Sequence, residues 1–432
     1  MDYRKIYNEK KVSVEKALSY IQSGDRIVTS LCAQAPFLLL SNLHSVAEQG
    51  KNIEIYSNMN LMPFPYFTEE KYRDKILVDC LFEMAGDRKG YKKGIVNYIP
   101  GHLHDGSWRW AEHHRPNVFI GAVSAMDEHG FCRFSLSNIH EKSLAEQADL
   151  VICEVNPNYP QVNGDNEIHI SEIDWIVESD NRIPVLPEGG PLSREDEAIG
   201  GYISSLIRDN DTIQLGIGKI PDAVADCLMD KHDLGVHTEL ISDAIYRLTE
   251  AGVITNRKKN FYKGKTVGTF ALGSQKLYNM LHNNPSILIM SGNYVNDPAV
   301  IAKNDNMVSV NTAIEVDLTG QVCSETIGTI QYSGSGGQSD TAQGAVASKG
   351  GRSIIALHST AKKGTVSTIN AIHTPGAIVT LSRNNIDYIV TEYGIAPMRG
   401  RNVRQRVENL IAVAHPDFRG ELRKDAEKYC LW

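Results

Sequence analysis

The sequence is constrained most by a regular alternation of short apolar runs with segments that have helical spacing. In the first half, apolar runs at residues 25–30, 52–58 and 150–155 alternate with helix-type stretches at 35–48 and 141–147. Strands that alternate with helices form parallel pairs, because a parallel neighbour is reached only through a long crossover. We therefore expect an α/β fold with open, mostly parallel sheets.

The second half of the chain repeats motifs of the first half in the same order. A loop and a proline that leads into a helix follow residues 21–27, and the same pattern follows residues 207–213. A strand-like segment that starts with aspartate occurs at 149–154 and again at 387–392. Repeated motifs in a fixed order indicate internal duplication. We expect two related α/β domains, with the active site in the cleft between them.

Periodicity is lost between residues 156 and 193, and the later part of this stretch marks the predicted domain boundary. Residues 184–193 contain three prolines and two glycines, which is typical of a linker. We predict an N-terminal domain over residues 1–190 and a C-terminal domain over residues 191–432. The expected strands of the second domain include residues 212–215, 266–271, 287–290, 308–311, 354–357, 377–381 and 388–390.

Composition and charge argue against several classes of function. Hydrophobic residues make up 42% and charged residues 22% of the chain, as in soluble globular proteins. The net charge of -8 argues against a nucleic-acid partner, which would require clustered basic residues. No apolar run reaches the roughly 20 residues that a bilayer requires. No signal peptide is evident, and the seven cysteines form no CxxC pair. We expect a cytoplasmic protein with no membrane partner.

Glu239 is the candidate nucleophile. It follows a short apolar run within residues 235–243 and precedes a helix-type pattern. A carboxylate that attacks an acyl group must be held at the end of an element and partly stripped of water. A junction between a strand and a helix provides both conditions. The alternative is an ordinary solvated or capping glutamate, which is the commoner role of this residue type.

A glycine loop upstream of Glu239 is a candidate site for phosphate or for an oxyanion. Gly216 and Gly218 follow a predicted strand, and Pro221 is expected as the first residue of a helix, where its missing N–H is harmless. Free N–H groups at a helix start bind anions. The loop lies one βαβ crossover before Glu239, so both are expected at the same carboxyl edge of a sheet. The alternative is a purely structural turn.

A second glycine loop, residues 332–340, contains three glycines among small polar residues. Such a loop suits a backbone that passes against a bulky ligand, and the alternative is a flexible surface loop. Downstream, Lys362 and Lys363 follow a predicted strand and offer two ammonium groups for phosphate. The alternative for these lysines is an exposed turn.

Three common chemistries lack support in the sequence. The histidine pairs at 102/104 and 113/114 have no Cys, His or Asp partners with zinc spacing, so no metal is expected. No G-x-S-x-G nucleophile elbow occurs. The Gly216 loop has Pro221 where a dinucleotide-binding fingerprint requires its third glycine.

An ordered set of segments resembles the acetyl-CoA hydrolase/transferase family, and within it the branch of 4-hydroxybutyrate and butyryl-CoA:acetate CoA-transferases. The resemblance covers nearly the whole chain and implies a fold similar to the class I CoA-transferases. We also expect a homo-oligomer, either a dimer or a tetramer. The segments that carry the resemblance are residues 1–3, 24–26, 123–130, 154–156, 214–221, 235–243, 334–340, 391–394 and 414–418.

The resemblance implies a covalent mechanism with Glu239 as the nucleophile. Attack on an acyl-CoA would give an acyl-glutamyl anhydride, and the returning CoA thiolate would form a glutamyl-CoA thioester that an acceptor carboxylate takes apart. CoA would be substrate and carrier, with no tightly bound cofactor. The implied oxyanion and CoA contacts are Gly216, Ile217, Gly218, Lys219 and Ile220. The implied contacts of CoA alone are Ile314, Gly337 and Lys363, with Lys362 as the alternative to Lys363.

The resemblance implies butyryl-CoA or 4-hydroxybutyryl-CoA as the acyl donor, with acetate as the small carboxylate partner. Members on the 4-hydroxybutyrate side tend to carry histidine where this chain has Leu31 and proline where it has Ala125, whereas Met126 is similar to the butyryl side. Leu31 fits either a more apolar acyl pocket or core packing. An acyl-CoA hydrolase with the same intermediate and a non-catalytic CoA-binding protein are the alternative functions.

Overall fold

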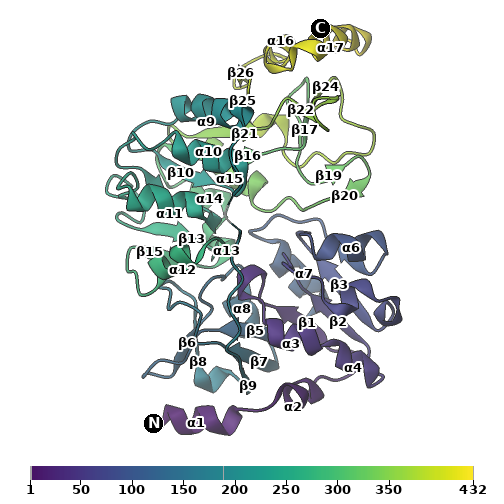
Figure 1. Ribbon diagram of the computed structural model, residues 1–432, viewed down its shortest axis with the longest axis vertical. Helices are drawn as coiled ribbons and strands as arrows, with labels where there is room; N and C mark the ends of the chain where they lie inside the picture. Colours follow the sequence, from purple (N-terminus) through teal and green to yellow (C-terminus); the bar gives the residue numbers. More distant parts are fainter. Residues whose placement is uncertain (1, 188, 432) are drawn as a thin grey trace. The chain divides into compact units, whose positions relative to one another are not determined.

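The computed structural model describes residues 2–187 and 189–431, and the chain forms two compact units (Figure 1). Unit 1 comprises Met1–Leu186 and Gly268–Tyr294, and unit 2 comprises Pro187–Val267 and Val295–Trp432. The grouping of Gly268–Tyr294 with the first half has no counterpart in the sequence pattern. The division into domains 1–190 and 191–432 stays a prediction.

Unit 1 is built on a seven-stranded sheet in which every neighbouring pair of strands is parallel. The strand order is β4-β3-β2-β1-β5-β7-β9, so the chain builds the sheet outwards from β1 in both directions. This architecture confirms the expected α/β class. The strands are β1 (Arg26–Thr29), β2 (Ile53–Tyr56), β3 (Ile76–Cys80), β4 (Val96–Tyr98), β5 (Val118–Val123), β7 (Leu150–Val155) and β9 (Trp175–Glu178).

Both faces of the unit 1 sheet are covered, because successive side chains of a strand point to opposite faces. In β1, Ile27 belongs to one apolar core and Val28 to another. In β7, Ile152 and Cys153 are divided in the same way. Continuous apolar strands are therefore buried on two sides, as parallel sheets require. The main helices are α1 (Tyr3–Lys10), α2 (Val14–Ser19), α3 (Phe37–Asn42), α4 (His44–Glu48), α6 (Asp87–Lys92), α7 (Gly106–His114), α8 (Glu141–Ala145) and α12 (Gln275–Leu281).

Unit 2 contains a six-stranded sheet in the order β11-β10-β16-β21-β25-β26. The first five strands are parallel to their neighbours, and β26 pairs antiparallel with β25. The carboxyl ends of five strands thus lie at one edge of this sheet. The strands are β11 (Gly235–Val236), β10 (Thr212–Leu215), β16 (Met307–Thr312), β21 (Arg352–Ala356), β25 (Tyr388–Thr391) and β26 (Gly394–Pro397).

Helices pack on the unit 2 sheet, and a short hairpin follows one of its strands. Helix α9 packs on α10, and α15 packs on β16 and β21. The hairpin of β22 (Thr360–Ala361) and β23 (Val366–Ser367) follows β21. The helices are α9 (Arg194–Leu206), α10 (Lys219–Asp226), α11 (Asp243–Glu250), α14 (Pro298–Ile301), α15 (Gln338–Ala347), α16 (Val403–Val413) and α17 (Pro416–Lys428).

Several element predictions are confirmed and others are wrong. The strands expected at 150–155 and 212–215 coincide with β7 and β10. The helix expected over 35–48 is instead two helices, α3 and α4, with Leu43 between them. Residues 377–381 form no strand, and β9 lies within residues 156–193, where the sequence predicts no regular element. Sequence spacing cannot separate one long helix from two short ones when both expose the same apolar face.

Two further predictions are corrected. Residues 266–271 and 287–290 lie outside the six-stranded sheet. Pro221 is the third residue of α10 rather than the first, because α10 begins at Lys219 with Gly218 as its cap. Its missing N–H is still harmless, since the first four N–H groups of a helix have no partner within the helix. Among the residues described, every helix is too short or too polar to cross a lipid bilayer.

Candidate active site at the edge of the unit 2 sheet

The backbone that carries Glu239 continues from the edge strand β11. Beyond that strand, the His237 N–H donates to Ile213 O of β10 at 3.3 Å, and the Thr238 N–H donates to Val267 O at 2.9 Å. Glu239 follows these two residues and lies four positions before the start of α11. It therefore lies in a bend just beyond the carboxyl end of a parallel strand, close to where the sequence placed it.

The Glu239 carboxylate has two donors from elsewhere in unit 2. The Asn296 Nδ2 donates to its Oε2 at 3.2 Å, and the backbone N–H of Gly337 also hydrogen-bonds the carboxylate. Gly337 caps the start of α15. A Cβ atom added at Gly337 would lie 1.9 Å from Glu239 Oε2 and 2.1 Å from Asn296 Nδ2. Only glycine allows this close approach of backbone to carboxylate.

The environment of Glu239 raises its pKa to about 7. Burial is the largest cause, because it penalises the ionised form, and repulsion from Asp340 adds to it. The hydrogen bonds from Asn296 and Gly337 act in the opposite direction. Glu239 is partly buried and has specific partners, so it is not the ordinary solvated glutamate that residue type alone suggests. A basic, desolvated carboxylate suits nucleophilic or proton-transfer chemistry.

The other predicted contact residues follow neighbouring strands of the same sheet. Gly216 to Ile220 follow β10, Ile314 follows β16, and Lys363 lies beyond β21. Glu239 follows β11, and these four strands are adjacent in the order β11-β10-β16-β21. Loops after adjacent parallel strands share one edge of the sheet, which is where open α/β sheets bind ligands. Among the predicted contact residues, Gly337 touches the Glu239 carboxylate directly, through its backbone N–H.

The predicted loop residues differ in exposure. Ile217 is 39% exposed, Gly218 and Lys219 are exposed, and the Ile220 side chain is 7% exposed. Gly218 has φ +116°, a conformation that favours glycine. Lys362 and Lys363 are both exposed with left-handed backbone in the β22–β23 turn, so the choice between them stays open. The roles of all these residues in CoA binding stay predictions.

Asn296 and Asp340 are the residues that sequence reasoning missed. Asp340 belongs to the second glycine loop, but its residue type alone indicates no role in the site. In the structure it is buried, at 0% exposed, and its charge raises the pKa of Glu239. Asn296 follows no recognisable motif and lies 57 positions from Glu239 in the sequence. No local pattern could have connected the two.

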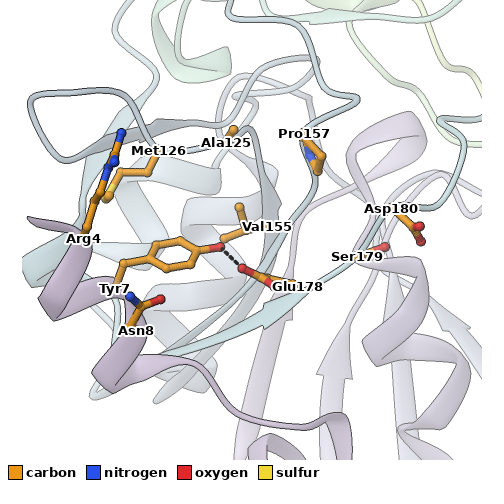
Figure 2. Close-up of a pocket in the computed structure, with 10 residues that line it drawn as sticks. All are labelled: Arg4, Tyr7, Asn8, Ala125, Met126, Val155, Pro157, Glu178, Ser179 and Asp180. Carbon is orange, nitrogen blue, oxygen red and sulfur yellow. Dashed lines mark hydrogen bonds between the residues drawn. The ribbon is translucent and has the colours of Figure 1, made fainter.

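A separate pocket of about 660 Å³ lies within unit 1 (Figure 2). The Tyr7 hydroxyl of α1 donates to Glu178 at 3.1 Å across its wall. Ala125 and Met126, the positions that the family resemblance connects with substrate class, line this pocket. None of the predicted CoA contacts and neither Glu239 nor Asn296 lines it.

One group of potential metal ligands is present among residues 2–187 and 189–431. Ligand atoms of Glu54, Asp79 and His114 lie within 4.8 Å of one another in unit 1. Each already has a protein partner: His114 and Arg26 pair with Glu54, and the Trp110 Nε1 donates to Asp79 at 2.9 Å. The arrangement is that of an ion-pair network, and the expectation that no metal is bound stays a prediction.

Comparisons with known proteins match both halves of the chain to one family. Residues 1–187 match the acetyl-CoA hydrolase/transferase N-terminal domain, and residues 273–426 match the corresponding C-terminal domain. A 4-hydroxybutyrate coenzyme A transferase of Clostridium kluyveri is 44% identical, over 99% of this chain and 100% of its own. A butyryl-CoA:acetate CoA-transferase of Anaerostipes caccae is 38% identical, over 100% and 99%. The crystal structure of RipA from Yersinia pestis matches with a TM-score of 0.93 at 37% identity, over 100% of both chains.

The two α/β units therefore define the fold that CoA-transferases and RipA share. The chain belongs to the acetyl-CoA hydrolase/transferase family, and it is an enzyme of the CoA-transferase class. The family predicted from the ordered sequence segments is confirmed.

If Glu239 is the nucleophile, we expect the rate of reaction with an acyl-CoA to rise with pH through a midpoint near 7, because only an ionised carboxylate can attack. Asp340→Asn removes the repulsion that raises the pKa of Glu239, so the midpoint should move to lower pH. The measurement is the pH profile of kcat/KM. Asp417→Asn, which changes an exposed acid of α17, serves as the control and should leave the midpoint in place. An unchanged midpoint in Asp340→Asn would contradict repulsion from Asp340 as a cause of the raised pKa of Glu239.

Gly337→Ala should reduce turnover by about 100-fold, since the new methyl group displaces the carboxylate or Asn296 and misplacing a reacting group by about 1 Å has effects of that size. Gly201→Ala is the matched control, because its Cβ would meet nothing within 4 Å. Turnover and thermal melting are measured for both variants. Full activity in a folded Gly337→Ala protein would show that the close contact is not needed.

Proposed function

We propose that this enzyme transfers CoA between a short-chain acyl-CoA and a small carboxylate through a covalent intermediate on Glu239. The observation that carries the proposal is the Glu239 carboxylate itself. It is desolvated, has a pKa of about 7, and is held by Asn296 and the backbone of Gly337 at the carboxyl edge of a parallel sheet. Full-length relatives named as CoA-transferases support the same reaction class.

Each proposed step exchanges one acyl bond for another. Glu239 attacks the thioester carbonyl, the C–S bond breaks, and CoA leaves as a thiolate while an acyl-glutamyl anhydride forms. The thiolate then attacks the glutamyl carbonyl, which releases the first carboxylate and leaves a glutamyl-CoA thioester. The acceptor carboxylate repeats the two exchanges in reverse order and leaves as the new acyl-CoA. No water is consumed, so the thioester is conserved and ping-pong kinetics result.

The glycine loop after β10 is proposed to stabilise the charge that develops during these attacks. Free N–H groups at the start of α10 would serve the oxyanion, and Gly216 to Ile220 would contact CoA. Ile314, Gly337 and Lys363 are proposed as further CoA contacts, with Lys363 meeting a charged part of the molecule. CoA is a substrate and carrier in this scheme, and no tightly bound cofactor takes part.

Glu239→Gln should abolish the covalent intermediate, because an amide cannot take part in the exchange. The protein is incubated with butyryl-CoA alone and reduced with borohydride, and the mass of the Glu239 peptide is measured. Replacing a buried acid whose pKa is raised should leave the melting temperature at pH 8 equal or higher, which separates lost chemistry from lost fold. A trapped adduct in this variant would refute the proposed nucleophile. No adduct in the wild type while CoA binds would favour a non-catalytic CoA-binding protein.

The acyl donor is proposed to be butyryl-CoA or 4-hydroxybutyryl-CoA, with acetate as the acceptor. Leu31 is 2% exposed, which fits both an apolar acyl pocket and core packing. If Leu31 shapes the pocket, butyryl-CoA should react faster than 4-hydroxybutyryl-CoA, and equal rates would contradict that role. Release of free CoA without acetate would identify a hydrolase, whereas a transferase forms acetyl-CoA only when acetate is present. Cytoplasmic location and a homo-oligomer stay predictions from the sequence.

A further inference from the structure

Two basic side chains are buried without a carboxylate partner and lie on, or bond to, the backbone that leads to Glu239. His237 is 1% exposed and Lys259 is 4% exposed. In the part of the chain that the structure describes, neither forms an ion pair. Burying a basic group without a counter-charge is unfavourable unless its N–H groups are satisfied. Both residues donate to backbone carbonyls, and two of these, Val236 O and Val295 O, belong to the segments that carry Glu239 and Asn296.

Lys259 holds the end of strand β11. Its Nζ donates to Val236 O at 2.6 Å and to Lys265 O at 2.8 Å. Its aliphatic stem lies so close to Gly235 that a Cβ there would be 2.4 Å from Lys259 Cγ. The amine group therefore bonds the last residue of the strand, three positions before Glu239. Burial lowers the pKa of Lys259 to about 7.

His237 holds the segment that carries Asn296. Its Nε2 lies 2.8 Å from Val295 O. Because a carbonyl can only accept, Nε2 carries the proton, and Nδ1 is buried without a partner. Burial and the charge of Lys259 lower the pKa of His237 to about 3, so the ring is neutral at physiological pH. Val295 immediately precedes Asn296, whose amide donates to Glu239.

These contacts close a ring of interactions. The backbone runs from His237 to Glu239, the Glu239 carboxylate accepts from Asn296, and the preceding carbonyl of Val295 accepts from His237. A shift of either backbone segment would change the position of the carboxylate. Misplacement of a reacting group by about 1 Å can reduce a rate about 100-fold, so small displacements are sufficient to matter.

We propose that His237 and Lys259 are positioning residues for Glu239, which hold the backbone at Val295 and at Val236 and so fix the carboxylate for attack on the acyl-CoA. Neither side chain touches the substrate in this role. The inference rests on the proposed function of Glu239 as the nucleophile. It differs from a role in core packing because it predicts a loss in the chemical step rather than in folding or in substrate binding.

The test compares His237→Met with His237→Gln. The two replacements have nearly the same size, but only the glutamine amide can donate to Val295 O. We expect His237→Met to slow formation of the Glu239 adduct with butyryl-CoA by about tenfold or more, with half-saturation by butyryl-CoA changed less than about twofold. His237→Gln should recover most of the rate. The adduct is followed by rapid quenching, borohydride reduction and mass measurement, below the melting temperature of each variant.

Lys259→Met provides an independent variant, because methionine keeps the stem against Gly235 and removes the amine. Adduct formation should again slow, with little change in half-saturation. Stability has a distinct signature. Between pH 7 and about 10 the unfolded lysine binds a proton that the folded Lys259 has released, so Lys259 contributes a rise of stability with pH over this range. Lys259→Met should lack this rise. An unchanged rise would show that Lys259 is not the uncompensated buried amine.

The outcomes separate this inference from the proposed function. A wild-type adduct rate in folded His237→Met, or equal losses in His237→Met and His237→Gln, would overturn the role of His237. A wild-type rate in Lys259→Met would overturn that of Lys259. If His237→Met does not fold, the rate of adduct formation in His237→Gln and the slower rate in Lys259→Met still test the two positioning roles. An adduct that persists in Glu239→Gln would instead refute the nucleophile, and the positioning roles would fail with it.

Discussion

The close approach of the Glu239 carboxylate to the backbone at the start of α15 is the constraint on which the site depends. Gly337 leaves no space for a side chain, Asn296 donates to the same oxygen, and Asp340 repels it. The hydrogen bonds favour the ionised form, whereas burial and repulsion oppose it. Burial and repulsion outweigh the hydrogen bonds, because the pKa of Glu239 is raised to about 7. The carboxylate is thus held in place and remains basic.

Parallel sheets explain why the site is assembled from distant parts of the chain. Both faces of such a sheet are covered by crossover helices, so the loops at the strand ends are the parts that remain available for ligands. In unit 2, adjacent strands bring together loops that hold Glu239, the Gly216 to Ile220 segment and Lys363. Unit 1 repeats the parallel plan with seven strands. Each unit therefore has an open, mostly parallel sheet of its own, and Glu239 lies at the edge of the sheet in unit 2.

The fold class was predictable because strand burial on both faces produces apolar runs that local spacing reveals. The strands at Leu150–Val155 and Thr212–Leu215 were found to the residue for this reason. Strand β9 was missed because it is short and lies among prolines, glycines and asparagines. The grouping of Gly268–Tyr294 with the first half was also missed, since the partners of a segment depend on long-range packing that spacing does not encode.

The sequence by itself determined the alternation of elements, the glycines that permit close backbone approach, and Glu239 as a carboxylate after a strand. These features are local, because they depend on residue type and spacing alone. Only the tertiary structure decided which donor reaches that carboxylate, which acid raises its pKa and which buried bases hold the backbone beside it. Asn296 is 57 positions away from Glu239, and contacts over such distances arise from the folding of the whole unit.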